Sequence, residues 1–226
     1  MPWDPRIEPL LDRYPPLRAV GNTPLVPVNI FRDELPNVEV LAKMESLNPG
    51  GSLKDRPVLR MLLGALADGR LQPGMTVLDS SSGNAGIAYA MIGRIVGLPV
   101  EIVIPTNASA ERTKRMRAHG ARLVFTDAML GYDEALREVR RRYETDPARY
   151  FFCDQYSNED NWRAHYETTA AEILEQTAGR ITHVVAGVGT GGTVTGLGRR
   201  LKEHDSKIRL VCVVPDVFPG IEGLKP

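Results

Sequence analysis

The sequence predicts an α/β fold with mainly parallel sheets, and three observations carry this prediction. From residue 76 onward, short apolar runs alternate with helical patterns of roughly 10–15 residues, which is typical of right-handed βαβ units. Runs such as Val100–Ile104 and Leu210–Val214 are apolar nearly throughout, as expected for strands that helices cover on both faces. Hydrophobic residues make up 42% of the 226 residues, which is enough for a sizeable core.

The first twenty residues are rich in proline, and we expect them to wrap over the surface before any regular element begins. The expected strands occupy residues 38–43, 76–79, 100–104, 122–126, 150–153, 183–186 and 208–214. The expected helices occupy residues 55–68, 86–96, 110–119, 132–143, 161–177 and 193–204.

Composition and charge argue against several functional classes. The 28 basic residues balance the 28 acidic ones, whereas a nucleic-acid partner requires uncompensated positive charge. No apolar run approaches the ~20 residues that span a bilayer, and the first residues do not resemble a signal peptide, so we expect no membrane partner and a cytoplasmic protein. Cys153 and Cys212 are expected to be buried thiols, and the four histidines show no metal-ligand spacing, so no metal is expected.

A glycine-rich segment, Gly187–Thr193, lies between an expected strand and the next helix. Glycines let the backbone approach a ligand, and amides at a helix N-terminus favour an anion, so a phosphate is the expected ligand. The segment also satisfies G-x-G-x-x-G at Gly187, Gly189 and Gly192, with Asp216 as a candidate ribose ligand. An NAD-dependent dehydrogenase therefore stays open as an alternative, as does a turn that serves close packing alone.

A second polar segment, Ser80–Gly83, lies between the strand expected at 76–79 and the following helix. Its hydroxyls, together with the amide of Asn84, are suited to binding a carboxylate. The alternative is helix capping by serine, which accounts for one of the serines but not for the rest.

Lys54 occupies an unusual position for a cation. It lies within one turn of the N-terminus of the helix expected at 55–68, where the helix dipole disfavours positive charge. Either Ser52 and Asp55 form a capping box, or Asp55 alone caps the helix with Pro57 in its first turn. A lysine whose pKa is lowered can act as a base or form a Schiff base, and an exposed lysine pointing into solvent is the alternative.

A phosphate site, a carboxylate site and an activated lysine are together the groups needed to bind pyridoxal phosphate and an amino acid. At this point the motifs Asn48–Arg56, Ser81–Asn84 and Gly189–Thr193 resemble the β-family of pyridoxal-phosphate enzymes, and within it the cysteine synthase and cystathionine β-synthase family. The segments Gly21–Leu25 and Gln155–Asn158 also match, so the resemblance extends from residue 20 onward.

The resemblance implies fold type II, with two three-layer α/β domains, the cofactor between them, and a homodimer. Residues 1–45 and 155–226 would form the large cofactor-binding domain, and residues 46–154 the small substrate-carboxylate domain. Only a short tail follows the strand expected at 208–214, so we expect the large domain to be incomplete at its C-terminus. The residue that faces the pyridine nitrogen in the family would lie in the missing part.

The resemblance also assigns roles to single residues. Lys54 would hold the cofactor and shuttle the Cα proton, and Asn84 would hydrogen-bond the pyridoxal hydroxyl. The cofactor phosphate would bind to Gly189, Thr190, Gly191, Gly192 and Thr193. The substrate carboxylate would bind to Ser81, Ser82, Gly83, Asn84 and Gln155.

The implied reaction is a β-replacement that makes L-cysteine from O-acetyl-L-serine and sulfide, through an aldimine and an aminoacrylate on Lys54. Cystathionine β-synthase and O-phosphoserine sulfhydrylase stay open as alternatives, and the Lys-Asp-Arg sequence disfavours a serine dehydratase. A cofactor-binding protein without turnover is a more distant alternative. Ala85 stands where many sulfhydrylases carry a threonine, so the identity of the donor is left open.

Overall fold

The computed structural model describes residues 3–30 and 32–216. Its strands are β1 (Leu25–Pro27), β2 (Leu41–Lys43), β3 (Thr76–Ser80), β4 (Val100–Pro105), β5 (Arg122–Thr126), β6 (Tyr150–Phe152), β7 (His183–Gly187) and β8 (Arg209–Val213). Its α-helices are α1 (Glu8–Arg13), α2 (Asp55–Ala67), α3 (Asn84–Val96), α4 (Ala110–Ala118), α5 (Gly131–Thr145), α6 (Glu159–Ala164), α7 (Ala170–Gln176) and α8 (Gly192–His204). Short 3-10 turns occupy Pro15–Ala19, Glu45–Leu47 and Ala128–Leu130, and a π-helical turn, η4, spans His165–Thr169.

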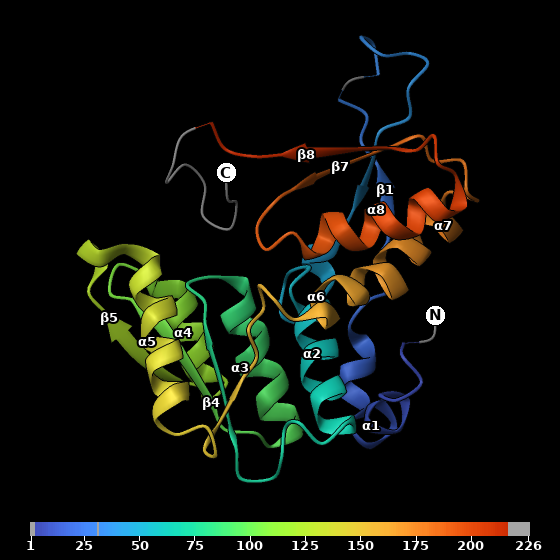
Figure 1. Cartoon of the computed structure of the whole chain (residues 1–226). Helices are drawn as coiled ribbons and strands as arrows, with labels where there is room; N and C mark the ends of the chain where they lie inside the picture. Colours follow the sequence, from blue (N-terminus) through green and yellow to red (C-terminus); the bar gives the residue numbers. More distant parts are fainter. Residues whose placement is uncertain (1–2, 31, 217–226) are drawn as a thin grey trace.

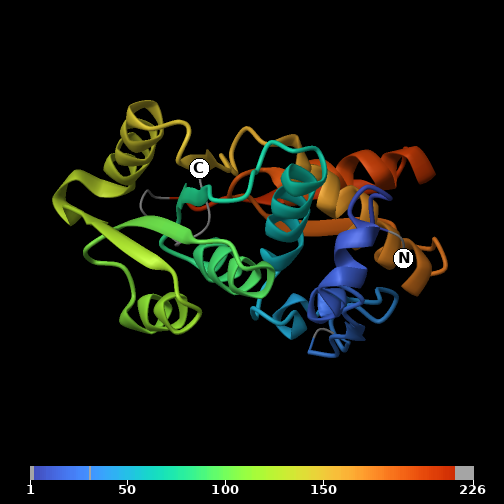
Figure 2. The same ribbon diagram turned by 90° about the horizontal axis from the view of Figure 1, so that it is seen from below.

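A parallel sheet with the order β5-β4-β3-β6 forms the centre of one half of the molecule. Successive side chains of a strand point to opposite faces, so Ile102 and Ile104 join the core beneath α3 and α4 while Val103 packs with Val139 of α5. Figure 2 shows α5 on one side of this sheet and α3 and α4 on the other. The predicted three-layer arrangement with a parallel sheet is therefore confirmed here.

A second, two-stranded parallel sheet pairs β7 with β8. Helices α7 and α8 cover one of its faces, where Ile173, Leu197 and Leu201 pack together (Figure 1). On this sheet Val185 is 66% exposed, so the strand β7 is covered on one side only among the described residues. A short antiparallel pair, β1 with β2, lies beside it.

The prediction for the first twenty residues was wrong. They contain helix α1 and a 3-10 turn, and Ile7, Leu11 and Leu17 are fully buried in the main core. Proline disfavours the interior of a helix but suits its first turn, and prolines occupy the first turn of both of these elements. The prolines of this segment therefore mark the starts of helical elements rather than an irregular chain.

Three further predictions need correction. The helix expected at 161–177 is interrupted by η4, and the strand expected at 38–43 is reduced to β2. Cys153 is buried as predicted, but Cys212 is exposed, because the apolar cluster beneath β8 ends with Leu210. The predicted domain boundaries stay a prediction, and within the described ranges every helix is too short or too polar to cross a membrane.

Candidate active site

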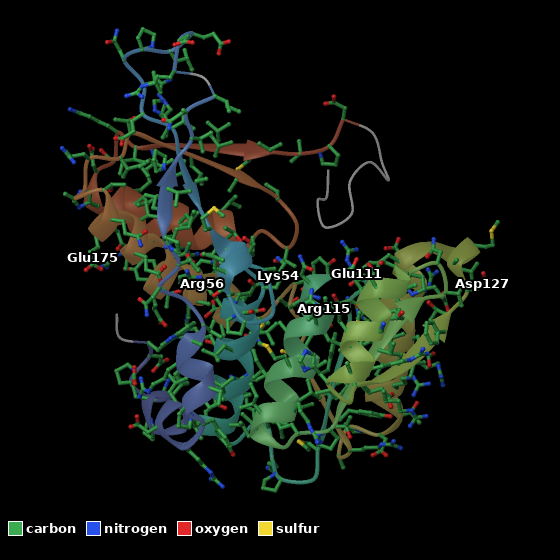
Figure 3. The ribbon with its side chains drawn as sticks, turned by 180° about the vertical axis from the view of Figure 1, so that it is seen from behind. Lys54, Arg56, Glu111, Arg115, Asp127 and Glu175 are labelled. Carbon is green, nitrogen blue, oxygen red and sulfur yellow. The ribbon has the colours of Figure 1, made fainter. Side chains whose placement is uncertain are left out.

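The three predicted segments each lie at the N-terminus of a helix. Lys54 directly precedes α2, the serine segment Ser80–Gly83 runs from the end of β3 to α3, and the glycine segment Gly187–Thr193 runs from the end of β7 into α8. Figure 3 shows Lys54 in the middle of the molecule, between the segments of the β7–β8 half and those of the four-stranded half. This arrangement directs three sets of helix N-terminal amides toward the centre, where they favour anions.

Lys54 is the residue immediately before α2, and no side chain caps this helix. The two predicted forms of capping were therefore wrong, because Asp55 accepts the backbone N–H of Gly50 at 2.5 Å instead. A Cβ at Gly50 would lie 2.3 Å from the Asp55 carboxylate, so only glycine at position 50 lets the loop before Lys54 pack against Asp55. Burial lowers the pKa of Lys54, whose ammonium has no hydrogen bond or ion pair within residues 3–30 and 32–216.

A buried ion cluster holds the first turn of α2. The Arg56 guanidinium is inaccessible to solvent and pairs with Glu45 at 2.7 Å and with Glu172 at 2.6 Å. Lys43 adds a third contact, at 2.6 Å from Glu172. Burial alone would raise the pKa of Glu172, but its hydrogen bonds and charge interaction with Arg56, together with Lys43, lower that pKa to about 2.

The cluster also explains the segment Gly21–Leu25, to which the sequence assigned no chemistry. Gly21 N–H donates to Asn48 Oδ1 at 2.8 Å, and Asn22 N–H donates to Glu172 at 2.9 Å. Gly21 has φ +94°, and a Cβ there would lie 3.1 Å from Arg56. This segment and the loop before Lys54 are thereby fixed to the same arginine.

The serine segment divides into a structural and an open part. Ser81 Oγ accepts the N–H groups of Gly86 at 3.0 Å and Gly83 at 3.3 Å, so this serine satisfies the amides that begin α3. Ser82 and Asn84 make no side-chain hydrogen bond to other described residues, which leaves both available to a ligand. Helix capping therefore accounts for Ser81 alone.

Gln155 lies against this segment, and its predicted contact with the substrate carboxylate stays a prediction. Its Nε2 donates to Ser80 O at 3.0 Å, and its backbone N–H donates to Asp79 at 3.3 Å. Asp79 is fully buried, and burial raises its pKa to about 7 although Tyr89 and two backbone amides hydrogen-bond to it. A buried carboxyl group, that of Asp79, thus directly precedes the serine segment and contacts Gln155.

The glycine segment begins α8 with Gly191 in the left-handed region, at φ +83°. Thr190 and Thr193 contact two buried residues of the preceding helices, Asn161 at 2.9 Å and His165 at 3.3 Å. No pattern in the sequence indicates a function for either residue. Burial lowers the pKa of His165 well below its usual value, and the charges of Lys54 and Arg56 lower it further.

Hydrogen bonds connect the serine and glycine segments, and Lys54 is related to them through its charge. Gln155 bonds to the serine segment, Asn161 bonds both to Gln155 O at 2.6 Å and to Thr190, and the charge of Lys54 acts on His165. In the described part of the chain, no group of three or more His, Cys, Asp or Glu side chains gathers into a metal site.

Comparisons with known proteins agree with this arrangement. A family model described as pyridoxal-phosphate dependent enzyme matches residues 17–225. A cysteine synthase of Aquifex aeolicus is 51% identical over 212 residues, which are 92% of this chain and 65% of that protein. A cystathionine beta-synthase of Apis mellifera is 41% identical and covers 88% of this chain and 40% of its own length.

The solved structure of a cysteine synthase from Entamoeba histolytica superposes with a TM-score of 0.86 at 37% identity, covering 93% of this chain and 67% of that one. The chain thus spans about two thirds of the length of these cysteine synthases and 40% of the length of the cystathionine beta-synthase. The match extends over nearly the whole of the sequence given, including all three segments of the site. The chain belongs to the family of pyridoxal-phosphate dependent enzymes.

Proposed function

We propose that this protein uses pyridoxal 5'-phosphate to make L-cysteine from O-acetyl-L-serine and sulfide by β-replacement. One observation carries the proposal: a half-buried lysine, whose ammonium has no hydrogen bond or ion pair among the described residues, lies beside two helix N-termini that are suited to anions and that Gln155 and Asn161 connect. The relatives named cysteine synthase support the choice of product, and the chain covers 65–71% of the length of several of them.

The residues present suit the cofactor. The glycine segment offers backbone amides and the hydroxyls of Thr190 and Thr193 to a phosphate, as the sequence predicted for Gly189–Thr193. Lys54, with its lowered pKa, offers an amine that is more easily deprotonated than an exposed lysine. Asn84, at the start of α3, is available for the pyridoxal hydroxyl.

The bound cofactor supplies an electron sink that stabilises negative charge at the Cα atom of an amino acid. The chain's own residues position the substrate and move its protons. Ser82, Gly83 and the first amides of α3 hold the carboxylate, supported from behind by Ser81 and Gln155. The amine of Lys54 takes the Cα proton and returns it after the sulfur nucleophile has added.

Cystathionine formation and O-phosphoserine sulfhydrylation use the same carboxylate and phosphate sites, and they are separated by the substrates tested. The comparisons do not favour a nicotinamide dehydrogenase, and Asp216 is exposed beyond the end of β8. We infer further that the protein acts in the cytoplasm as a homodimer, on the grounds of the family resemblance.

The test is visible spectroscopy of the 226-residue chain purified with pyridoxal 5'-phosphate. We expect the absorption band of a lysine-bound cofactor, and we expect Lys54→Ala to lose that band, whereas Lys202→Ala on exposed α8 retains it. Addition of O-acetyl-L-serine and sulfide should then yield L-cysteine. A colourless protein that binds NADH would refute the proposal, and turnover restricted to O-phosphoserine or homocysteine would reassign the substrates.

A further inference from the structure

Two buried polar side chains lie behind the glycine segment, and the proposed function gives them no role. Asn161 of α6 and His165 of η4 are four residues apart, so their side chains lie on the same helical face. Asn161 is 5% exposed and His165 is 1% exposed. Each contacts one threonine of the glycine segment.

Asn161 determines which way the hydroxyl of Thr190 can donate. The amide nitrogen of Asn161 must face Gln155 O, because a carbonyl oxygen accepts but cannot donate, and the contact is 2.6 Å. The same nitrogen donates to Thr190 Oγ1 at 2.9 Å, and Gly192 N–H donates to this oxygen at 3.4 Å. Both lone pairs of the hydroxyl are thereby occupied, so its proton is left to donate to a ligand.

His165 has the corresponding relation to Thr193. Its Nδ1 lies 3.0 Å from Thr169 Oγ1, and its Nε2 lies 3.3 Å from Thr193 Oγ1. A neutral imidazole carries one N–H, and when Nδ1 accepts from the Thr169 hydroxyl, Nε2–H donates to Thr193. Thr193 then accepts from the histidine, and its own proton is available to an anion.

Glycines in α8 make these contacts possible. A Cβ at Gly192 would lie 2.1 Å from Asn161 Oδ1, and a Cβ at Gly196 would lie 2.7 Å from His165 Cβ. The backbone of α8 therefore packs directly against residues of α6 and η4, with no room for side chains at Gly192 and Gly196. The π-helical turn places His165 in this interface, and such turns are frequent at functional sites.

We propose that Asn161 and His165 are positioning residues that direct the hydroxyl protons of Thr190 and Thr193 toward the phosphate of the cofactor. The proposal rests on the proposed function, because it needs a phosphate in the glycine segment. Through its contact with Gln155 O, Asn161 also joins the phosphate site to the segment behind the substrate carboxylate.

The test compares the affinities of the whole chain for pyridoxal 5'-phosphate and for pyridoxal, which lacks the phosphate. His165→Leu removes both nitrogens, and His165→Gln restores a donor amide. The matched control is Thr168→Val, which removes a buried hydroxyl of the same π-helical turn that donates to Ala164 O at 2.6 Å rather than to the glycine segment. The ³¹P chemical shift of the bound cofactor is a second readout.

We expect His165→Leu to weaken binding of pyridoxal 5'-phosphate about tenfold, which is the loss of one hydrogen bond to a charged group. Binding of pyridoxal should be unchanged, and His165→Gln should recover part of the loss. His165→Leu should also shift the ³¹P resonance, whereas Thr168→Val should leave both affinities and the resonance unchanged.

A double-mutant cycle tests whether His165 acts through Thr193. In a chain that already carries Thr193→Val, the change His165→Leu should cause little further loss of affinity. Equal losses for both ligands, or additive losses in the cycle, would overturn the proposal while leaving the proposed function standing. A wild-type chain that binds pyridoxal 5'-phosphate no more tightly than pyridoxal would refute the proposed function as well.

Discussion

The buried contact between Glu172 and Arg56 makes a quantitative prediction for the variant Glu172→Gln. The Glu172 carboxylate is 4% exposed and accepts from Arg56 at 2.6 and 2.7 Å, from Lys43 at 2.6 Å and from Asn22 N–H at 2.9 Å. The variant keeps the size of the side chain and removes its charge, so Arg56 retains one carboxylate partner, Glu45, instead of two.

Two independent arguments give the magnitude of the loss. Removing one partner of a buried ion pair costs about 3–5 kcal/mol of unfolding free energy. The pKa of Glu172 falls from 4.5 to about 2, which corresponds to up to about 3 kcal/mol for a carboxylate that water screens so little. We therefore expect Glu172→Gln to lower the unfolding free energy at pH 7 by about 3 kcal/mol.

The sign of the pH dependence follows from the direction of the shift. The folded-state pKa of Glu172 lies below its unfolded value, so its contribution is present above pH 4.5 and is lost as the pH falls toward 2. The difference between wild type and variant should therefore shrink between pH 5 and pH 3. Urea denaturation followed by circular dichroism at both pH values measures it.

The matched control is Glu175→Gln, an exposed glutamate on the same helix, labelled in Figure 3, which should change the unfolding free energy by less than about 0.5 kcal/mol. A loss below about 1 kcal/mol for Glu172→Gln at pH 7 would refute the assignment of this cluster as the anchor of the lysine loop. A difference that stays constant from pH 7 to pH 3 would refute the role of the charge.

Three other variants test separate parts of the site. Burial raises the pKa of Asp79 from 3.8 to about 7, so the folded protein loses stability as the pH rises from 4 to 7 and this carboxyl group must ionise. The melting temperature of Asp79→Asn relative to that of the wild type should therefore increase from pH 4 to pH 8, and a constant difference would contradict the raised pKa. Ala85→Thr should lower the KM for O-acetyl-L-serine about two- to tenfold, because it adds a hydroxyl near the substrate carboxylate. Initial-rate measurements would show this change, and an unchanged KM would mean that residue 85 does not contact the substrate. Gly192→Ala should weaken binding of pyridoxal 5'-phosphate at least about tenfold in equilibrium titrations, because the added Cβ would displace Asn161. An affinity equal to that of the wild type would mean that the glycine segment tolerates a side chain at position 192.

The local patterns of the sequence were sufficient to predict the parallel sheet, and they pointed to three segments that the fold places at helix N-termini. Strands β4 and β5 are mostly apolar runs, and the three segments of the candidate site consist of neighbouring residues that lead into a helix N-terminus. The failures have equally local causes. Prolines in the first turn of α1 were interpreted as breakers, and η4 has nearly the same apolar spacing as the α-helix expected in its place.

The supporting side chains of the site could not be predicted from these patterns. Glu172 pairs with an arginine that lies 116 residues earlier in the sequence, and His165 reaches a threonine that lies 28 residues later. A single histidine or glutamate in a helix carries no local signal, because only the tertiary structure decides whether it faces solvent or a buried partner. The two signals that did exist were the arginine two residues after Lys54 and the Gly21–Leu25 segment, which both lead to Glu172.

These supports have a common origin in one stretch of the chain, residues 155–172. Gln155 holds the serine segment, Asn161 and His165 hold the glycine segment, and Glu172 holds the arginine that follows Lys54. The three segments of the candidate site therefore share a single support although they are far apart in the sequence. A change in the length of this support would move the glycine segment, the serine segment and Lys54 relative to one another. The π-helical turn η4 lies between Asn161 and Glu172, so a change in its length would shift the residues that hold the glycine segment relative to the one that holds Arg56.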